Sequence, residues 1–121
     1  MDSYRSLVAW QQAHAVVLLV LRGTNRGAQP RTWALFDQLR RAAISIEANI
    51  VEGYALRGPL QFRRHLRIAL GSAAEAECLL NLAQELEFLS SDIAADIRAP
   101  LDRCIGALVG LVRTKTVRGE G

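Results

Sequence analysis

The sequence is poor in the residues that small secreted proteins and metal sites use most. Its 121 residues include two cysteines, three prolines and two histidines, and aromatic residues make up 6%. Cys78 and Cys104 are too few and too far apart for a disulfide framework or a zinc site. Both fall on apolar positions of expected helices, so we expect two buried free thiols. The sequence therefore predicts no bound metal and no cofactor.

Long apolar runs are also missing. The longest, around residues 13–21, is much shorter than the roughly 20 residues needed to span a bilayer. The first residues lack the basic-then-apolar order of a signal peptide. We therefore expect a soluble, cytoplasmic protein that does not enter the membrane.

What the sequence does contain is alanine, leucine and heptad spacing. Half of the residues are hydrophobic, and apolar positions recur at alternating steps of three and four. Glycines and prolines divide the chain into helices over 4–22, 32–54, 59–88 and 91–113, followed by a frayed polar tail, 114–121. Short connections predict one all-α domain over 1–121, an antiparallel up-down-up-down four-helix bundle. Pro100 should kink the last helix or split it in two.

The heptads also predict which residues face the core. The inward positions are Leu7, Trp10, His14, Val17 and Leu21 in the first helix; Phe36, Leu39, Ala43, Ile46 and Ile50 in the second; Phe62, Leu66, Ala69, Ala73, Ala76, Leu80 and Ala83 in the third; and Ile93, Ile97, Pro100, Cys104, Ala107 and Leu111 in the fourth. The first and fourth helices are apolar around most of their circumference, although a bundle helix needs only one apolar stripe. This surplus predicts a homo-oligomer whose subunits meet through Val16, Leu19, Val20, Leu108, Val109 and Val112.

Charge is distributed unevenly along the chain. Residues 31–70 contain seven arginines and three acids, whereas residues 71–96 contain six acids and no base. Arginine's planar guanidinium matches phosphate geometry, and a row of arginines can follow a nucleic-acid backbone without reading its sequence. The candidate nucleic-acid-binding residues are Arg40, Arg57, Arg63, Arg64 and Arg67. Some of them could instead pair with acids of a neighbouring subunit; we expect Arg63 and Arg64 to be free.

A second group of polar residues follows one side of the second helix. Arg41, Ser45, Asn49 and Glu52 are spaced by four, four and three, and Arg67, Ser72 and Glu75 could face them from the third helix. Partly buried charges need partners, so we expect a structural network between helices or subunits. The same residues could alternatively line a ligand pocket.

Catalytic motifs are missing from the sequence. The Glu-x-x-His pairs of di-metal bundles do not occur, because Gln11 and Phe62 stand three residues before His14 and His65. His14 is expected to be a hydrogen-bonded core histidine. No phosphate-binding loop or nucleophile elbow is present, and we do not expect an enzyme.

Several motifs resemble a known family. LRRAA at 39–43, ANI at 48–50, EGY at 52–54 and LGS at 70–72 occur in order, and VAWQQAHAVVL at 8–18 precedes them. The chain resembles the four-helix-bundle family of 23S ribosomal RNA intervening-sequence proteins. It departs from the family at Glu47, where a proline is common, and this should straighten the second helix.

The resemblance implies a homopentameric ring without an established enzymatic activity. A related branch of the family is the accessory protein of diversity-generating retroelements, which partners a reverse transcriptase and is thought to bind nucleic acid. The leading hypothesis is therefore a non-enzymatic oligomeric scaffold that binds RNA or DNA through phosphate contacts. The alternative is a protein-interaction adaptor that docks a partner such as a reverse transcriptase.

Overall fold

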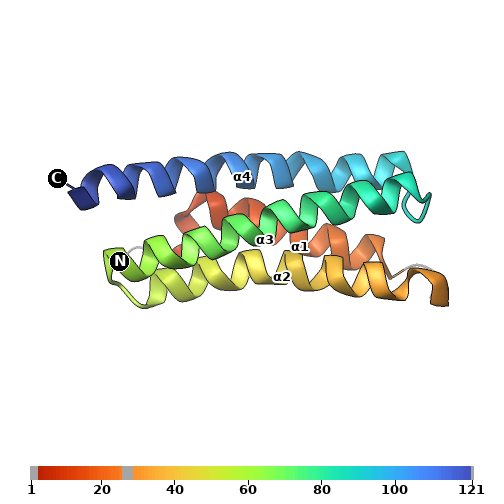
Figure 1. The fold of residues 1–121 in the computed structure, drawn as a ribbon, viewed down its shortest axis with the longest axis horizontal. Helices are drawn as coiled ribbons and strands as arrows, with labels where there is room; N and C mark the ends of the chain where they lie inside the picture. Colours follow the sequence, from red (N-terminus) through yellow and green to blue (C-terminus); the bar gives the residue numbers. More distant parts are fainter. Residues whose placement is uncertain (1–2, 26–28, 121) are drawn as a thin grey trace.

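Four α-helices form the molecule in the computed structural model, which describes residues 3–25 and 29–120, with side chains as far as residue 113 (Figure 1). They are α1 (Val8–Gly23), α2 (Trp33–Ala55), α3 (Pro59–Glu85) and α4 (Ser91–Glu120). Short 3-10 turns, Tyr4–Ser6 and Pro30–Thr32, precede α1 and α2. None of the described helices is apolar over a stretch long enough to cross a bilayer.

Successive helices run in opposite directions. α2 packs against α3, α3 against α4, and α1 against both α4 and α2, which closes the four helices around one core. The predicted antiparallel up-down-up-down bundle is confirmed. Figure 1 shows that the start of α1, the turn between α2 and α3, and the end of α4 lie together. We call this the α2–α3 end of the bundle; the opposite end carries the α3–α4 turn.

The core contains the predicted positions of α2 and α3. All five inward residues of α2 are buried, and those of α3 are buried except Phe62, which packs against the core from its edge. The prediction for α1 is right for Val17, and Leu7 and Trp10 pack against the core from its edge, but the other buried residues are Ala9, Ala13, Val16 and Val20, one position before the expected Trp10, His14, Val17 and Leu21. In α4 the expected Ile97, Pro100 and Cys104 are buried, whereas Ile93, Ala107 and Leu111 are only partly buried and Ala94, Leu101 and Leu108 are buried in addition. Both helices are apolar on several sides, so spacing alone did not decide which side faces inward.

Three expected subunit contacts are wrong for the same reason. Val16, Val20 and Leu108 have no exposed surface within a single chain, so they cannot touch a neighbouring subunit. Leu19, Val109 and Val112 keep some exposed surface.

Apolar side chains are exposed on both α1 and α2. Leu18, Leu21 and Ile44 are exposed, and a hollow lined by Val17, Ile44, Glu47, Ala48, Val51 and Glu52 follows the two helices. We call this surface the α1–α2 groove.

Three helix boundaries differ from the expectation by three residues or more: α1 begins at Val8 rather than at residue 4, α3 ends early, and α4 ends late. α3 ends at Glu85 rather than Phe88, because Glu87 adopts a left-handed backbone (φ 63°). The Phe88 and Glu87 amides then donate to the carbonyls of Ala83 and Gln84, which satisfies the end of the helix. The Ser90 hydroxyl accepts from the Ile93 amide at the start of α4, as a capping serine should.

The fourth helix is longer than expected. Pro100 does not split α4, and the backbone stays helical through the segment expected to be a frayed tail, as far as Glu120. Proline removes one backbone hydrogen bond. Pro100 is buried against the bundle, and packing on both sides of it holds the helix together.

Candidate nucleic-acid interface

Three arginines of the expected set share one exposed surface on the first turns of α3. Pro59 starts the helix with a favourable φ and no amide to satisfy. Spacings of one, three and four then bring Arg63, Arg64 and Arg67 to the outside of α3. Together with Leu60 and Ile68 they line a shallow hollow of about 450 Å³. We call these five residues the basic face.

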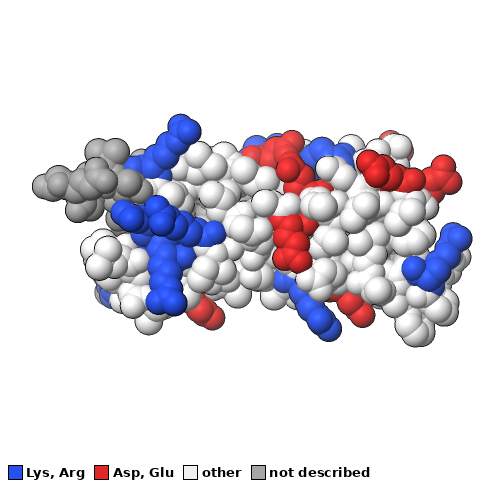
Figure 2. Space-filling model, in the orientation of Figure 1, with Lys and Arg blue, Asp and Glu red and all other residues white. Residues whose placement is uncertain are grey.

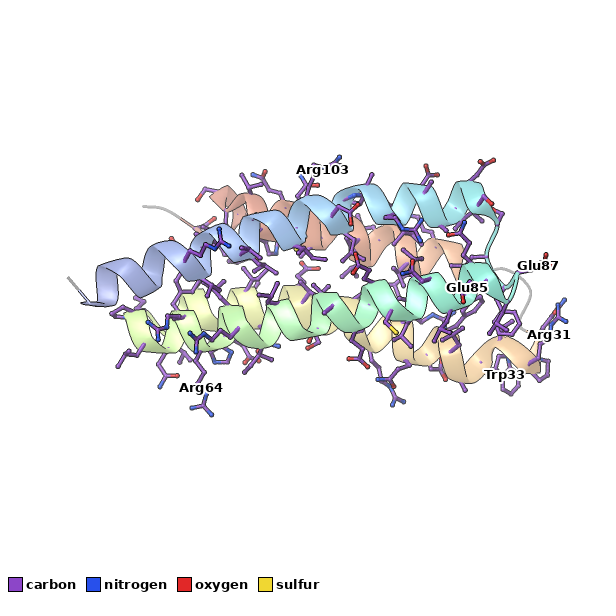
Figure 3. All side chains as sticks on the ribbon, turned by 45° about the horizontal axis from the view of Figure 1, so that its top comes forward. Arg31, Trp33, Arg64, Glu85, Glu87 and Arg103 are labelled. Atoms are coloured by element: carbon purple, nitrogen blue, oxygen red, sulfur yellow. The ribbon has the colours of Figure 1, made fainter. Side chains whose placement is uncertain are left out.

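The acid of α3 nearest to the basic face in sequence is Glu75, eight residues or about 12 Å of helix beyond Arg67, and the acids at the end of the helix lie much farther away. Arg64 points outward near the α2–α3 end, whereas Glu85 and Glu87 lie at the other end (Figure 3). The 21 residues between Arg64 and Glu85 correspond to about 30 Å of helix. Figure 2 shows the same separation, with blue side chains gathered at the end where α3 begins and red ones farther along.

The arginines of the basic face have no acidic partner in the described part of the chain. Among the residues that the structure describes, Arg63, Arg64 and Arg67 form no ion pair and no side-chain hydrogen bond. A guanidinium without an intramolecular partner keeps all five N–H donors for a ligand. This arrangement can bind phosphate groups.

Arg57 lies next to this surface, in the α2–α3 turn. Its backbone is left-handed (φ 59°), and Gly58 follows it as the N-cap of α3. It lines a separate hollow of about 570 Å³ with Gly53, Tyr54, Gly58, Pro59 and Phe62.

Arg40 does not join the other arginines. Its Nε donates to the Thr24 hydroxyl at 2.8 Å, one Nη donates to the Thr24 carbonyl at 2.6 Å, and the other reaches Asp37 at 3.2 Å. It thus neutralises the negative C-terminal end of α1. Arg57 is 17 residues farther along the chain, just beyond the end of α2, about 25 Å away. Asp37, three residues before Arg40, was the sequence signal for this local pairing.

The α2–α3 polar network contains part of the expected set and one residue that was missed. The hydroxyls of Ser45 and Ser72 share a hydrogen bond of 2.8 Å, and the Asn49 amide donates to the Ser45 carbonyl at 2.9 Å. His65 completes it, with Nδ1 2.9 Å from Asn49 Oδ1. His65 precedes Ser72 by two helical turns, so the heptad placed both on the same side of α3.

Three residues expected in the network lie on its outside. The Glu52 side chain is 65% exposed and its carboxylate is 3.8 Å from His65 Nδ1. Glu75 accepts a hydrogen bond of 2.6 Å from Gln38, which also joins α2 and α3. Arg41 is exposed. The neutral members therefore form the partly buried bonds, and the charged ones stay in solvent, where ion pairs contribute little.

His14 connects α1 to α2 but is not a core residue. Its Nδ1 lies 3.0 Å from Glu47 Oε2, its ring stacks on Trp10 at 4.9 Å, and 44% of its side chain is exposed. Glu47, the departure from the family pattern, thus has a partner on another helix. α2 runs unbroken through it.

The two cysteines differ, contrary to expectation. Cys104 is buried, and this burial raises its pKa from 9.0 to about 12, because a thiolate would lose its hydration. Cys78 is exposed on α3, so its predicted burial is wrong.

No group of three metal-ligating side chains occurs in the described part of the chain.

The architecture defines the class of protein, a small antiparallel four-helix bundle with a basic surface at one end. The particular family follows from comparison with known proteins. The model of the 23S rRNA-intervening sequence protein family matches residues 5–110, and the chain belongs to this family. No curated protein sequence matches the chain.

Proposed function

We propose that this protein is a non-enzymatic, homo-oligomeric scaffold that binds RNA or DNA through phosphate contacts. The observation that carries the proposal is the basic face, where Arg63, Arg64 and Arg67 are close together without an acidic partner among the described residues. Arginines in this state gain more from phosphate than arginines that must first break an ion pair. Such contacts are independent of sequence and suit a scaffold.

Oligomer formation is proposed from the α1–α2 groove and from family membership. Ile44 is exposed in it next to Val17, Ala48 and Val51, and monomers rarely leave a continuous apolar surface uncovered. Assembly of five chains, the number implied by the family resemblance, would repeat the basic face five times. Weak phosphate contacts on each subunit would then add through avidity.

Binding is tested by fluorescence anisotropy with labelled RNA and DNA oligomers at several salt concentrations. Three phosphate contacts per subunit predict a slope of log K against log salt of about −2 for a single strand. Arg63→Glu/Arg64→Glu should abolish most of the binding. Arg31→Glu/Arg103→Glu makes the same change in net charge at sites away from the basic face and should retain it. An affinity that does not depend on salt concentration, or an equal loss of affinity in the two variants, would refute the phosphate model.

Assembly is tested by size-exclusion chromatography with light scattering. The expected mass is five times the 13.3 kDa of one chain. Ile44→Glu should break the oligomer, because it places a charge in the α1–α2 groove. Leu86→Glu changes an exposed leucine at the α3–α4 end and is the matched control. A monomer mass for the unmodified chain at micromolar concentration would end the oligomer proposal.

The basic face also favours a second candidate, an adaptor that docks a protein such as a reverse transcriptase. Leu60 is 79% exposed and Ile68 is also exposed, so apolar side chains flank the arginines. Protein interfaces use such apolar contacts, whereas phosphate binding does not need them. Leu60→Ala/Ile68→Ala should weaken a protein complex while leaving nucleic-acid affinity unchanged; a protein complex of unchanged affinity would refute the adaptor.

A further inference from the structure

The hollow at the α2–α3 turn has a chemistry different from that of the basic face beside it. Its volume is about 570 Å³, and its walls include two aromatic rings and one guanidinium, from Tyr54, Phe62 and Arg57. The two rings meet edge to face, with centroids 6.2 Å apart. This contact holds Tyr54 in place, so a flat ligand would meet a ring that is already oriented.

A planar heteroaromatic ring fits this combination of groups. Bases of single-stranded nucleic acids stack on aromatic side chains and on the guanidinium plane of arginine, whatever their sequence. Duplex bases cannot do so, because they are already stacked on one another. The lining of the hollow therefore favours an unpaired base over a paired one.

The hollow is continuous in sequence with the basic face. Phe62 lines the hollow, and Arg63 and Arg64, the next residues of α3, line the basic face. No described residue lines both surfaces, and successive positions of a helix are rotated by about 100°, so a strand whose base enters the hollow reaches the arginines by passing around the first turn of α3, about 5 Å along the axis. One short stretch of strand can use both surfaces.

The backbone of Arg57 is left-handed, as is common just beyond the end of a helix. Its φ of 59° lies in the left-handed region, where a glycine would fit with less strain. Gly58 stands next to it but has a φ of −96°. The turn thus places arginine in the conformation that favours glycine, at the edge of the hollow. Glu87 has the corresponding conformation at the α3–α4 turn, which provides a matched control.

We propose that the hollow binds an unpaired nucleobase against Tyr54 and Arg57, so that the protein prefers single-stranded RNA or DNA to duplex. The inference rests on the proposed function, because the phosphates of the same strand are held by the basic face. It adds the ligand class, a single strand with at least one accessible base.

The test compares three labelled probes of equal length by anisotropy at fixed salt: a single strand, its duplex, and an abasic strand that keeps the phosphates. The unmodified protein should bind the single strand about 10-fold more tightly than the abasic strand, the effect of one stacked base. Tyr54→Ala should remove this difference, and Tyr54→Phe should retain it. Arg57→Gly should weaken single-strand binding, and Glu87→Gly should not.

The outcomes separate the inference from the function on which it rests. Equal affinity of the unmodified protein for the single and abasic strands, with binding still lost in Arg63→Glu/Arg64→Glu, overturns the base site and leaves the phosphate scaffold standing. Failure of the unmodified protein to bind any probe overturns both. The abasic comparison uses the unmodified chain, so it decides the question even where Tyr54→Ala loses helicity.

Discussion

Replacing Gly53 by alanine tests how closely α2 and α3 approach one another beside the hollow at the α2–α3 turn. Gly53 is buried in the last turns of α2, and an added Cβ would lie 2.7 Å from the Cβ of His65 and 3.2 Å from Cδ1 of Phe62. The His65 Cβ is bound directly to the backbone and cannot rotate away. Relief therefore requires the two helices to separate, which also pulls His65 from Asn49.

The magnitude follows from two opposing terms. In a helix interior, alanine stabilises the folded chain by about 1 kcal/mol relative to glycine. Overpacking of a close contact costs about 1–3 kcal/mol, and a backbone-bound Cβ at this distance belongs at the upper limit. Gly53→Ala should therefore lose about 2 kcal/mol of unfolding free energy. Gly71→Ala is the control: in the described part of the chain no neighbouring side chain or helix comes within 4 Å of an added Cβ, so this variant should gain about 1 kcal/mol.

Urea unfolding monitored by circular dichroism measures the stability of both variants. Both are measured at the same protein concentration, because the apparent stability of an oligomer depends on concentration. A difference of about 3 kcal/mol between the two corresponds to roughly 2 M in the urea midpoint for a chain of this size. Gly53→Ala with the same midpoint as Gly71→Ala would refute the close approach. A loss of stability in Gly71→Ala would show that another subunit covers that side of α3.

Three further results are expected. Asn49→Ala should cost about 1–3 kcal/mol in urea unfolding because it leaves partly buried hydrogen-bond partners unsatisfied, whereas Glu52→Ala should cost less than about 1 kcal/mol because its side chain lies in solvent; similar losses would contradict this. A thiol reagent should label Cys78 in the folded protein and Cys104 only after unfolding, and rapid labelling of both would show that Cys104 is accessible. Since the folded Cys104 stays neutral up to a pKa of about 12 while the unfolded thiol ionises near 9, stability should fall between these pH values by about 1.4 kcal/mol per unit; in Cys104→Ala this part of the slope should disappear.

The helices and part of their packing could be predicted from spacing alone. In α2 and α3 a single apolar stripe faces a polar side, so only one orientation buries the apolar residues. That is why Leu39, Ile46, Leu66 and Leu80 are buried as expected. The grouping of Arg63, Arg64 and Arg67 was equally predictable, because residues three and four apart on a helix are neighbours.

Other features depend on partners far apart in the sequence. Arg40 was expected among the phosphate-binding residues, but it lies beside Thr24 from the end of α1. His65 had no expected role until Asn49 was seen 2.9 Å away. In these cases, the local pattern identified a polar residue but not which other helix would face it.

The amino-acid sequence by itself determined four helices, an antiparallel order and the helix that carries the arginines, because these follow from local periodicity and short connections. Only the tertiary structure decided which sides of α1 and α4 face inward, since both are apolar on several sides and packing against neighbours selects one. It also brought Tyr54, Arg57 and Phe62 around one hollow, because two helices and the turn between them must meet before such a surface exists.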